Sequence, residues 1–294
     1  MTGISYEVRD RVMTGDGLLR QEPTMLKMAT QLYAEQKAGP LCSGGLGSFA
    51  FMPITDFITE DGRRELKELF DKYCQDIDGN RREQYEVLRE IYENPQESTG
   101  SAYMFLAQVN LHTFRTSQDF TEDLLPGNFV SLGVTHLHPL SRGSVHISSA
   151  DPEAAPIIDP QYFSNPMDVE FMARHLRFVE TIAETQALGS FLKPGGQRND
   201  ATAFVKDLDA AREYARDTAL SDDHPACSCP MLPRDKGGVV NERLVVYGTN
   251  NLRIVDASAM PLIPRGNLQT SVYAVAERAA DLIKEDHLFN RSQP

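Results

Sequence analysis

The sequence predicts an α+β fold in which mixed or antiparallel sheets are flanked by helices. Short strands and amphipathic helices are intermixed in the first part of the 294-residue chain, and the middle part turns to strands with alternating apolar residues. No segment has the pattern of a nucleotide-binding βαβ unit. We therefore expect helices packed around mixed sheets.

The N-terminal part is expected to begin with a strand over residues 3–8. A helix is predicted over residues 22–37, because helically spaced apolar residues lie between a proline start and a Gly-Pro stop. Residues 48–54 are apolar and are interpreted as a buried strand. Two amphipathic helices with charged outer faces are predicted over residues 63–75 and 81–93.

The middle of the chain is predicted to form an antiparallel hairpin. Residues 102–111 are apolar and aromatic, and residues 130–135 alternate as in a half-buried strand. A turn at residues 139–143 is followed by residues 144–149, which alternate again. We expect the two alternating runs to pair with each other.

The C-terminal part is predicted to hold three helices and two short apolar runs, residues 244–247 and 252–255. Asn165 suits the N-cap of the first helix and Pro166 its first position. The other two helices cover residues 207–218 and 270–285. The apolar strand, residues 252–255, is followed by a polar loop and the last helix. A strand end, a loop and a helix N-terminus in this order suit anionic or electron-rich ligands.

The composition excludes several classes of function. Acidic residues outnumber basic ones by 42 to 29, a net charge of −13, which disfavours binding to a nucleic-acid backbone. No apolar run approaches the roughly 18 residues that span a bilayer, and the first residues lack the basic and apolar regions of a signal peptide. Four cysteines are too few for a disulfide scaffold. We therefore expect a soluble globular chain, and its compartment is not indicated.

Three motifs have both a chemical and a structural interpretation. The segment from Gly45 to Ala50 fits the dinucleotide pattern G-x-G-x-x-A, but a helix end precedes it and a strand follows, so we interpret it as a structural turn. His224 with Cys227 and Cys229 is a weak metal pattern without a fourth ligand, and we predict no metal site. His224 is instead a candidate base in a loop, or else an ordinary surface histidine.

Asp256 and Ser258 follow the short strand and either face a ligand or simply cap a turn. Three histidines, His136, His138 and His146, are interpreted as sheet-face or turn residues. The remaining histidines, His112, His175 and His287, form no pattern.

Three segments in the second half of the chain share the order and spacing of a known family. The first is His138-Pro-Leu-Ser-Arg-Gly-Ser-Val with Ser149-Ala-Asp-Pro and Pro156-Ile-Ile-Asp-Pro. The second is His224-Pro-Ala-Cys-Ser-Cys-Pro-Met, and the third runs from Gly238 through Asp256-Ala-Ser-Ala-Met-Pro and Gly266-Asn267 into the last helix. Together they resemble the C-terminal part of the glucose-methanol-choline (GMC) flavin oxidoreductases. The residues before position 130 are compatible with the substrate domain of that family, but less specifically.

The resemblance implies the FAD-dependent oxidation of an alcohol. In this family, hydride passes from the alcohol carbon to N5 of FAD while a base takes the hydroxyl proton. His224 matches that base, a role that suits a side chain titrating near neutral pH. Asn267 falls where many relatives carry a second histidine and some an asparagine. Its amide can hydrogen-bond the alkoxide oxygen but cannot act as a base.

Four further residues are implied to contact the flavin. Asp256 and Ala257 match positions that contact its ribityl–phosphate region. Leu268 and Thr270 match positions where backbone groups and the helix N-terminus face the pyrimidine end. The helix dipole there would favour the anionic reduced flavin.

The resemblance divides the chain into a substrate-binding domain, residues 1–220, and a C-terminal remnant of the FAD-binding domain, residues 221–294. The sequence departs from the family at Cys227-Ser228, where Gly-Thr is usual. The family's N-terminal dinucleotide-binding motif is also absent. We therefore expect this chain alone to bind FAD weakly or not at all. A partner chain, or an upstream part of the same protein, would supply the nucleotide-binding half.

Two other functions stay open from the sequence. A protein that had lost the flavin but kept its pocket and His224 would be a small-molecule binding protein or an acid–base enzyme, such as an isomerase or dehydratase. A structural interaction module would rest on the exposed helices at residues 63–75 and 81–93. For the oxidoreductase, the expected ligand is a small-molecule alcohol whose identity the sequence does not specify.

Overall fold

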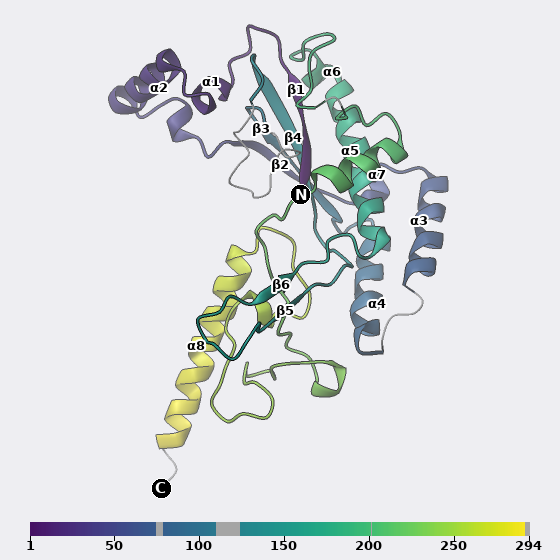
Figure 1. Ribbon diagram of the computed structural model, residues 1–294, viewed down its shortest axis with the longest axis vertical. Helices are drawn as coiled ribbons and strands as arrows, with labels where there is room; N and C mark the ends of the chain where they lie inside the picture. Colours follow the sequence, from purple (N-terminus) through teal and green to yellow (C-terminus); the bar gives the residue numbers. More distant parts are fainter. Residues whose placement is uncertain (75–78, 110–123, 201, 292–294) are drawn as a thin grey trace. The chain divides into compact units, whose positions relative to one another are not determined.

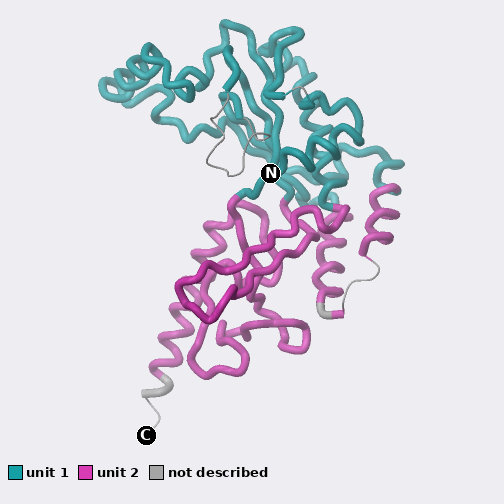
Figure 2. The backbone as a smooth tube through the Cα atoms, viewed as in Figure 1, with its two compact units in different colours: residues 1–64, 94–136, 168–222 teal, residues 65–93, 137–167, 223–294 magenta. Residues whose placement is uncertain are grey.

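The computed structural model describes residues 1–74, 79–109, 124–200 and 202–291 (Figure 1). They form two compact units, each assembled from three stretches of the chain (Figure 2). Unit 1 contains residues 1–64, 94–136 and 168–222, and unit 2 contains residues 65–93, 137–167 and 223–294. The division predicted at residue 220 separates a substrate-binding part from an FAD-binding part, and it stays a prediction.

Unit 1 is built on a four-stranded antiparallel sheet in the order β1-β4-β3-β2 (Figure 1). The strands are β1 (Thr2–Glu7), β2 (Leu46–Met52), β3 (Gly100–Phe105) and β4 (Phe129–His136). Gly3 lies opposite Gly133, and Ala102 opposite Val134. The strand predicted at the start of the chain is confirmed, and so is the mixed α+β class. Of the apolar run predicted over residues 102–111, residues 110 and 111 lie outside the described part of the chain.

One face of this sheet holds the core of unit 1. Alternate side chains of β1 and β4 point to that face and pack against α5 (Pro166–Glu184) and α7 (Leu208–Thr218). The core residues from these four elements include Ile4, Tyr6, Leu132, Val134, Met172, Leu176, Val179, Ala211 and Tyr214. The sheet is therefore fixed to the two helices by aliphatic and aromatic contacts.

β4 is buried on both faces, so the prediction of a half-buried strand was wrong. On the second face the Ser131 hydroxyl donates to the carbonyl of Ala107 (2.6 Å) and lies 2.7 Å from the hydroxyl of Ser5. Small polar residues in an alternating strand are usually interpreted as facing water. Here they form hydrogen bonds inside the unit instead.

β2 is an exposed edge strand, so the prediction of a buried strand over residues 48–54 was also wrong. Within β2 only Met52 is buried, while Phe49 and Phe51 are exposed and contact each other edge to face with ring centroids 5.2 Å apart. An apolar strand segment does not reveal by itself whether its sheet position is central or at an edge.

The hairpin predicted between residues 130–135 and 144–149 does not form. β4 pairs with β1 and β3, whereas β5 (Ser144–His146) pairs with β6 (Ile157–Asp159) in a separate two-stranded sheet of unit 2. Alternation specifies which side chains share a face, but it does not specify the partner strand. The alternating pattern of residues 144–149 also does not indicate burial, because Val145 and Ile147 are exposed.

The helices agree closely with the predictions. Their bounds are α1 (Asp16–Leu19), α2 (Pro23–Gln36), α3 (Glu60–Tyr73), α4 (Gly79–Glu93), α5, α6 (Gln186–Gly189), α7 and α8 (Gln269–Arg291), with short 3-10 turns at Pro40–Cys42, Ile54–Asp56, Arg234–Lys236 and Ala257–Ala259. Asn165 Oδ1 accepts from the Met167 amide at 3.0 Å, as expected for the start of α5. In α8 the side chains of Ala279 and Leu282 are buried, whereas Ile283 is exposed. In the described part of the chain, no helix is long and apolar enough to cross a membrane.

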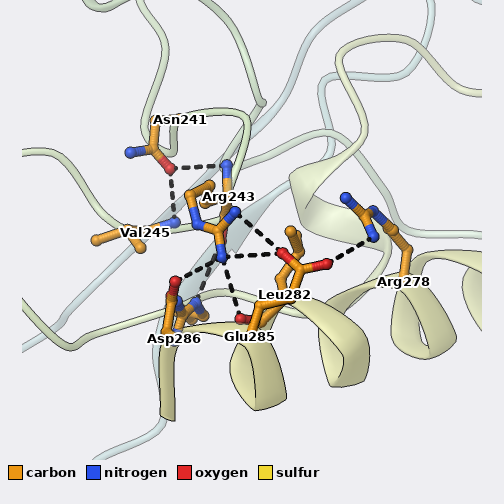
Figure 3. A network of polar contacts seen from close by, with 8 residues as sticks. Asn241, Arg243, Val245, Arg278, Leu282, Glu285 and Asp286 are labelled. Atoms are coloured by element: carbon orange, nitrogen blue, oxygen red, sulfur yellow. Dashed lines mark hydrogen bonds and ion pairs between the residues drawn. The ribbon is translucent and has the colours of Figure 1, made fainter. Parts of the chain in front are cut away.

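The C-terminal part of unit 2 has a small apolar core, and polar contacts tie it to α8 (Figure 3). The core consists of Val240, Leu244, Ala259 and Ala279 with a few partly buried neighbours. Arg243 Nη2 donates to the Leu282 carbonyl at 3.2 Å and to Asp286 Oδ1 at 2.5 Å, and Arg253 also pairs with Asp286. These contacts hold the segment around Arg243 against the helix that follows the candidate site.

Candidate active site

The loop that carries His224 is fixed by backbone hydrogen bonds to the segment after Asp256. Three alternate N–H groups donate to three successive carbonyls: Cys227 to Ala257 (3.1 Å), Cys229 to Ser258 (2.9 Å) and Met231 to Ala259 (2.9 Å). Backbone bonds of this kind do not depend on side-chain identity. The unusual residues of the loop are therefore compatible with a defined position for His224.

Cys227 has a left-handed backbone conformation, with φ of +68°. This is the region that favours glycine, and Cys227 stands where the resembling family usually carries glycine. Burial raises the pKa of the Cys227 thiol to about 11, although the nearby charge of Arg142 lowers it. At neutral pH the thiol is therefore protonated and is a poor nucleophile.

His224 lies against Gly266, the residue before Asn267. A Cβ atom at Gly266 would be 3.4 Å from His224 Cε1 and 3.5 Å from Nδ1, which is ordinary van der Waals contact. The imidazole is partly exposed and Asn267 is exposed. Unit 2 thus brings the two residues predicted to be catalytic into neighbouring positions.

Asp256 and Ala257 have structural partners within unit 2. Asp256 Oδ1 accepts from the amide of Ser258 (2.8 Å) and from its hydroxyl (2.5 Å), which caps the short turn Ala257–Ala259. The capping role considered from the sequence is therefore present. The Asp256 carboxylate is also exposed. The predicted flavin contacts of these two residues stay predictions.

Leu268 and Thr270 lie at the start of α8. The Leu268 carbonyl accepts from the Val272 amide at 3.0 Å, and its side chain is buried. Thr270 is exposed in the first turn, and that turn carries no acidic residue. The positive end of the helix dipole is therefore not offset by a carboxylate of its own first turn.

Two residues form hydrogen bonds to the stretch before Gly266, and the sequence did not predict these contacts. His138 is buried, and its Nδ1 lies 3.2 Å from the carbonyl of Ile263. Gln84 of α4 donates to the carbonyl of Pro261 at 3.2 Å. Both contacts fix the stretch that leads to Gly266. The motif around His138 was visible in the sequence, but a hydrogen bond to a carbonyl far along the chain has no local signal.

The other histidines are not gathered into a site. In unit 1, His136 Nε2 lies 3.0 Å from Asp168 Oδ1, and burial lowers the pKa of His175 to about 3. His146 and His287 are exposed, and His112 lies outside the described residues. Among the residues that the structure describes, no group of three or more histidine, cysteine or acidic side chains is placed to hold a metal ion.

The glycine pair Gly45 and Gly47 is part of a turn and an edge strand. Gly45 has φ of +85° and leads directly into β2, which pairs antiparallel with β3. A dinucleotide-binding loop would instead connect a strand to a following helix. The interpretation of this motif as a structural turn is confirmed.

Relatives of known family cover the chain. Residues 139–276 match the family model described as GMC oxidoreductase. The dehydrogenase citC of Monascus ruber is 30% identical over 310 residues, which cover 99% of this chain and 47% of that protein. The GMC oxidoreductase family protein Mala s 12 of Malassezia sympodialis is 38% identical over 154 residues, which cover 52% of this chain and 24% of that protein.

Solved structures share the fold. An FAD-dependent oxidoreductase from Chaetomium thermophilum matches 98% of this chain and 48% of its own, with a TM-score of 0.75 and 22% identity. A fungal aryl-alcohol oxidase matches 97% of this chain and 47% of its own, with a TM-score of 0.70 and 25% identity. The chain thus spans about half the length of the curated relatives it matches. The chain belongs to the GMC oxidoreductase family, for which FAD is the implied cofactor.

Proposed function

We propose that this chain forms the part of an FAD-dependent alcohol oxidoreductase that carries the catalytic base, with His224 in that role. The supporting observation is the contact between the His224 imidazole and Gly266, which makes His224 a neighbour of Asn267. A base and an amide side by side can act on one hydroxyl group: the base takes its proton and the amide donates to its oxygen.

The residues of unit 2 fit one end of a flavin by their donor chemistry. The first turn of α8, with Thr270, offers backbone N–H groups and the positive end of a 23-residue helix. Leu268 and Thr270 would hold the electron-rich pyrimidine end there, and Asp256 with Ala257 would lie toward the ribityl chain. A bound FAD would supply the acceptor for the hydride of the alcohol carbon.

The chain's own residues would bind and deprotonate the alcohol. The partly exposed His224 ring accepts the hydroxyl proton on an imidazole nitrogen. Asn267 cannot take up a proton at neutral pH, so its amide orients the substrate oxygen and stabilises the charge that develops there. The Cys227 thiol does not compete as a base or nucleophile, because burial keeps it protonated.

The nucleotide-binding half of the enzyme would come from another polypeptide segment, upstream in the same protein or in a partner chain. The matched relatives are about twice as long as this chain. The expected substrate is a small-molecule alcohol.

The experiment is a thermal shift and visible spectrum with FAD, first for this chain alone and then with a nucleotide-binding half supplied. Ligand stabilisation grows as ln(1 + [L]/Kd). We expect little or no shift for the chain alone, and stoichiometric visible flavin absorbance in the assembled protein. An assembled protein that holds no flavin would overturn the proposal.

A further inference from the structure

Helix α4 contacts two other segments of unit 2 through side chains of one face. Gln84 and Tyr92 are eight residues apart, a spacing that places both side chains on the same side of a helix. Nε2 of Gln84 donates to the carbonyl of Pro261 at 3.2 Å, and the hydroxyl of Tyr92 donates to the carbonyl of His138. The helix thus connects the turn that begins at His138 with the stretch that begins at Pro261.

His138 lies in a buried turn. The residue is 5% exposed, and Leu140, two residues further on, is fully buried. The hydroxyl of Tyr85 in α4 donates to the Leu140 carbonyl at 2.7 Å. Pro139 follows His138 and restricts its backbone to extended conformations. The backbone around His138 is therefore constrained, and its imidazole has a defined position.

The imidazole of His138 donates a hydrogen bond to the stretch before Asn267. Its Nδ1 lies 3.2 Å from the carbonyl oxygen of Ile263. A carbonyl oxygen can only accept, so Nδ1 must carry the proton. The contact therefore selects the Nδ1–H form of the ring. A side chain without a donor at this place would leave the Ile263 carbonyl without this bond.

Only a short piece of chain separates Ile263 from Asn267. Pro264 follows Ile263, fixes its own φ and restricts the residue before it. On the other side of Asn267, Leu268 is 4% exposed and begins the first turn of α8. The piece that carries Asn267 is thus held at both ends, at the Ile263 carbonyl and at Leu268. Loss of the first holding point would let the exposed Asn267 amide adopt more positions.

We propose that His138 is a positioning residue: through Ile263 it holds the Asn267 amide where that amide can donate to the oxygen of the alcohol. The inference rests on the proposed function, in which Asn267 stabilises the charge that develops on this oxygen. It adds a residue that acts through a carbonyl four positions before Asn267. A displaced amide stabilises the transition state less, so the limiting rate should fall more than the half-saturating alcohol concentration rises.

The test removes the donor of His138 and then restores it. In His138→Leu a carbon stands where Nδ1 lies, and in His138→Asn an amide nitrogen stands at the same number of bonds from Cα. His138→Gln, whose donor lies one bond further out, is a milder second variant. Thr99→Val is the matched control, because Thr99 is buried in unit 1 and its hydroxyl accepts from the Ile54 amide at 3.0 Å. Melting temperatures of the free chains identify variants that do not fold.

The first measurement compares the amide signals of Gly266 and Asn267 in nitrogen–proton correlation spectra of the chain alone. All three substitutions of His138 remove the aromatic ring, so a difference between them reports the donor. We expect multiple or broadened signals in His138→Leu, single signals in His138→Asn and in Thr99→Val, and intermediate behaviour in His138→Gln. Single signals in His138→Leu, or equal broadening in the Leu and Asn variants, would overturn the positioning role. These spectra need neither flavin nor substrate.

The second measurement follows alcohol-dependent flavin reduction without oxygen, in the protein assembled with the nucleotide-binding half and FAD. We expect His138→Leu to lower the limiting rate about tenfold, with less than about a threefold rise in the half-saturating alcohol concentration. His138→Asn should recover most of the loss, and Thr99→Val should change the rate by less than about twofold.

A double-mutant cycle separates positioning from a general structural role. In an Asn267→Ala background, His138→Leu should have little further effect, because the group through which it acts is absent. An equal effect of His138→Leu with and without the Asn267 amide would overturn the positioning role. A wild type that oxidises no alcohol would contradict the proposed function alone, because the spectra of the free chain still test the contact.

Discussion

Lowering the pH from 7 to 5 should destabilise unit 1 through one buried histidine. His175 is fully buried, and its Nε2 lies 3.2 Å from the hydroxyl of Thr99. Its other nitrogen, Nδ1, has no hydrogen-bond partner in the part of the chain that the structure describes. Burial, followed by the nearby His136, lowers the pKa of His175 from 6.5 to about 3.

The size of the effect follows from this difference in pKa. Between pH 6.5 and 3 the unfolded state binds a proton at His175 that the folded state does not bind. The free energy of unfolding therefore falls as the pH falls, by up to about 1.4 kcal/mol per pH unit. From pH 7 to pH 5 the expected loss is about 2 kcal/mol, of the order of a fifth of the stability of a typical domain.

The assay is urea unfolding of the wild type and of His175→Leu at half-unit steps between pH 7 and 5. The variant loses the bond to Thr99 and is less stable at pH 7, but its stability should depend less on pH. The exposed His146, changed to leucine, is the matched control and should retain the slope of the wild type. Parallel pH profiles for the wild type and His175→Leu would refute the reasoning.

Three further perturbations test other parts of the structure. Cys227→Gly should raise the free energy of unfolding by up to about 1 kcal/mol in urea titrations, because φ is +68° there. A lower free energy of unfolding would contradict the expected backbone strain at this position. Gly133→Ala should lower the free energy of unfolding by about 2 kcal/mol or more in the same titrations, since the new methyl group would lie 2.1 Å from Tyr103 Cζ. An unchanged urea midpoint would argue against this packing. Asp286→Asn should lower the melting temperature at pH 7. Hydrogen bonds from Arg243 lower the pKa of Asp286, so its contribution is lost as the pH falls, and the wild type and variant should converge in acid; a constant difference would contradict the pairing.

The helices could be predicted because their signals are local. Asn165 and Pro166 indicate the start of α5. Asp207 caps α7 by accepting a hydrogen bond from the amide of Ala210 at 2.8 Å. Strand pairing depends on distant segments, and here prediction failed. β4 lies between β1 and β3, and β5, which begins at residue 144, pairs with β6. The exposure of β2 likewise depends on its edge position.

The residues of the candidate site could be predicted from the sequence, but the contacts that hold them in place could not. Family resemblance named His224 and Asn267, and the structure makes them neighbours through Gly266. The contacts that fix them, from His138 and Gln84, join residues more than a hundred positions apart in the sequence. The left-handed backbone of Cys227 is visible only in three dimensions, although its position in place of a family glycine was a hint.

The most direct test of the central claim is the rate of alcohol oxidation without His224. The protein is assembled from this chain, the nucleotide-binding half and FAD, and alcohol-dependent loss of visible flavin absorbance is followed without oxygen. The panel of primary alcohols starts with benzyl alcohol. His224→Asn should slow the reaction by about 10²- to 10⁴-fold with flavin still bound, while His146→Asn should not. An unchanged rate in His224→Asn, or no oxidation of any alcohol by the wild type, would contradict the account.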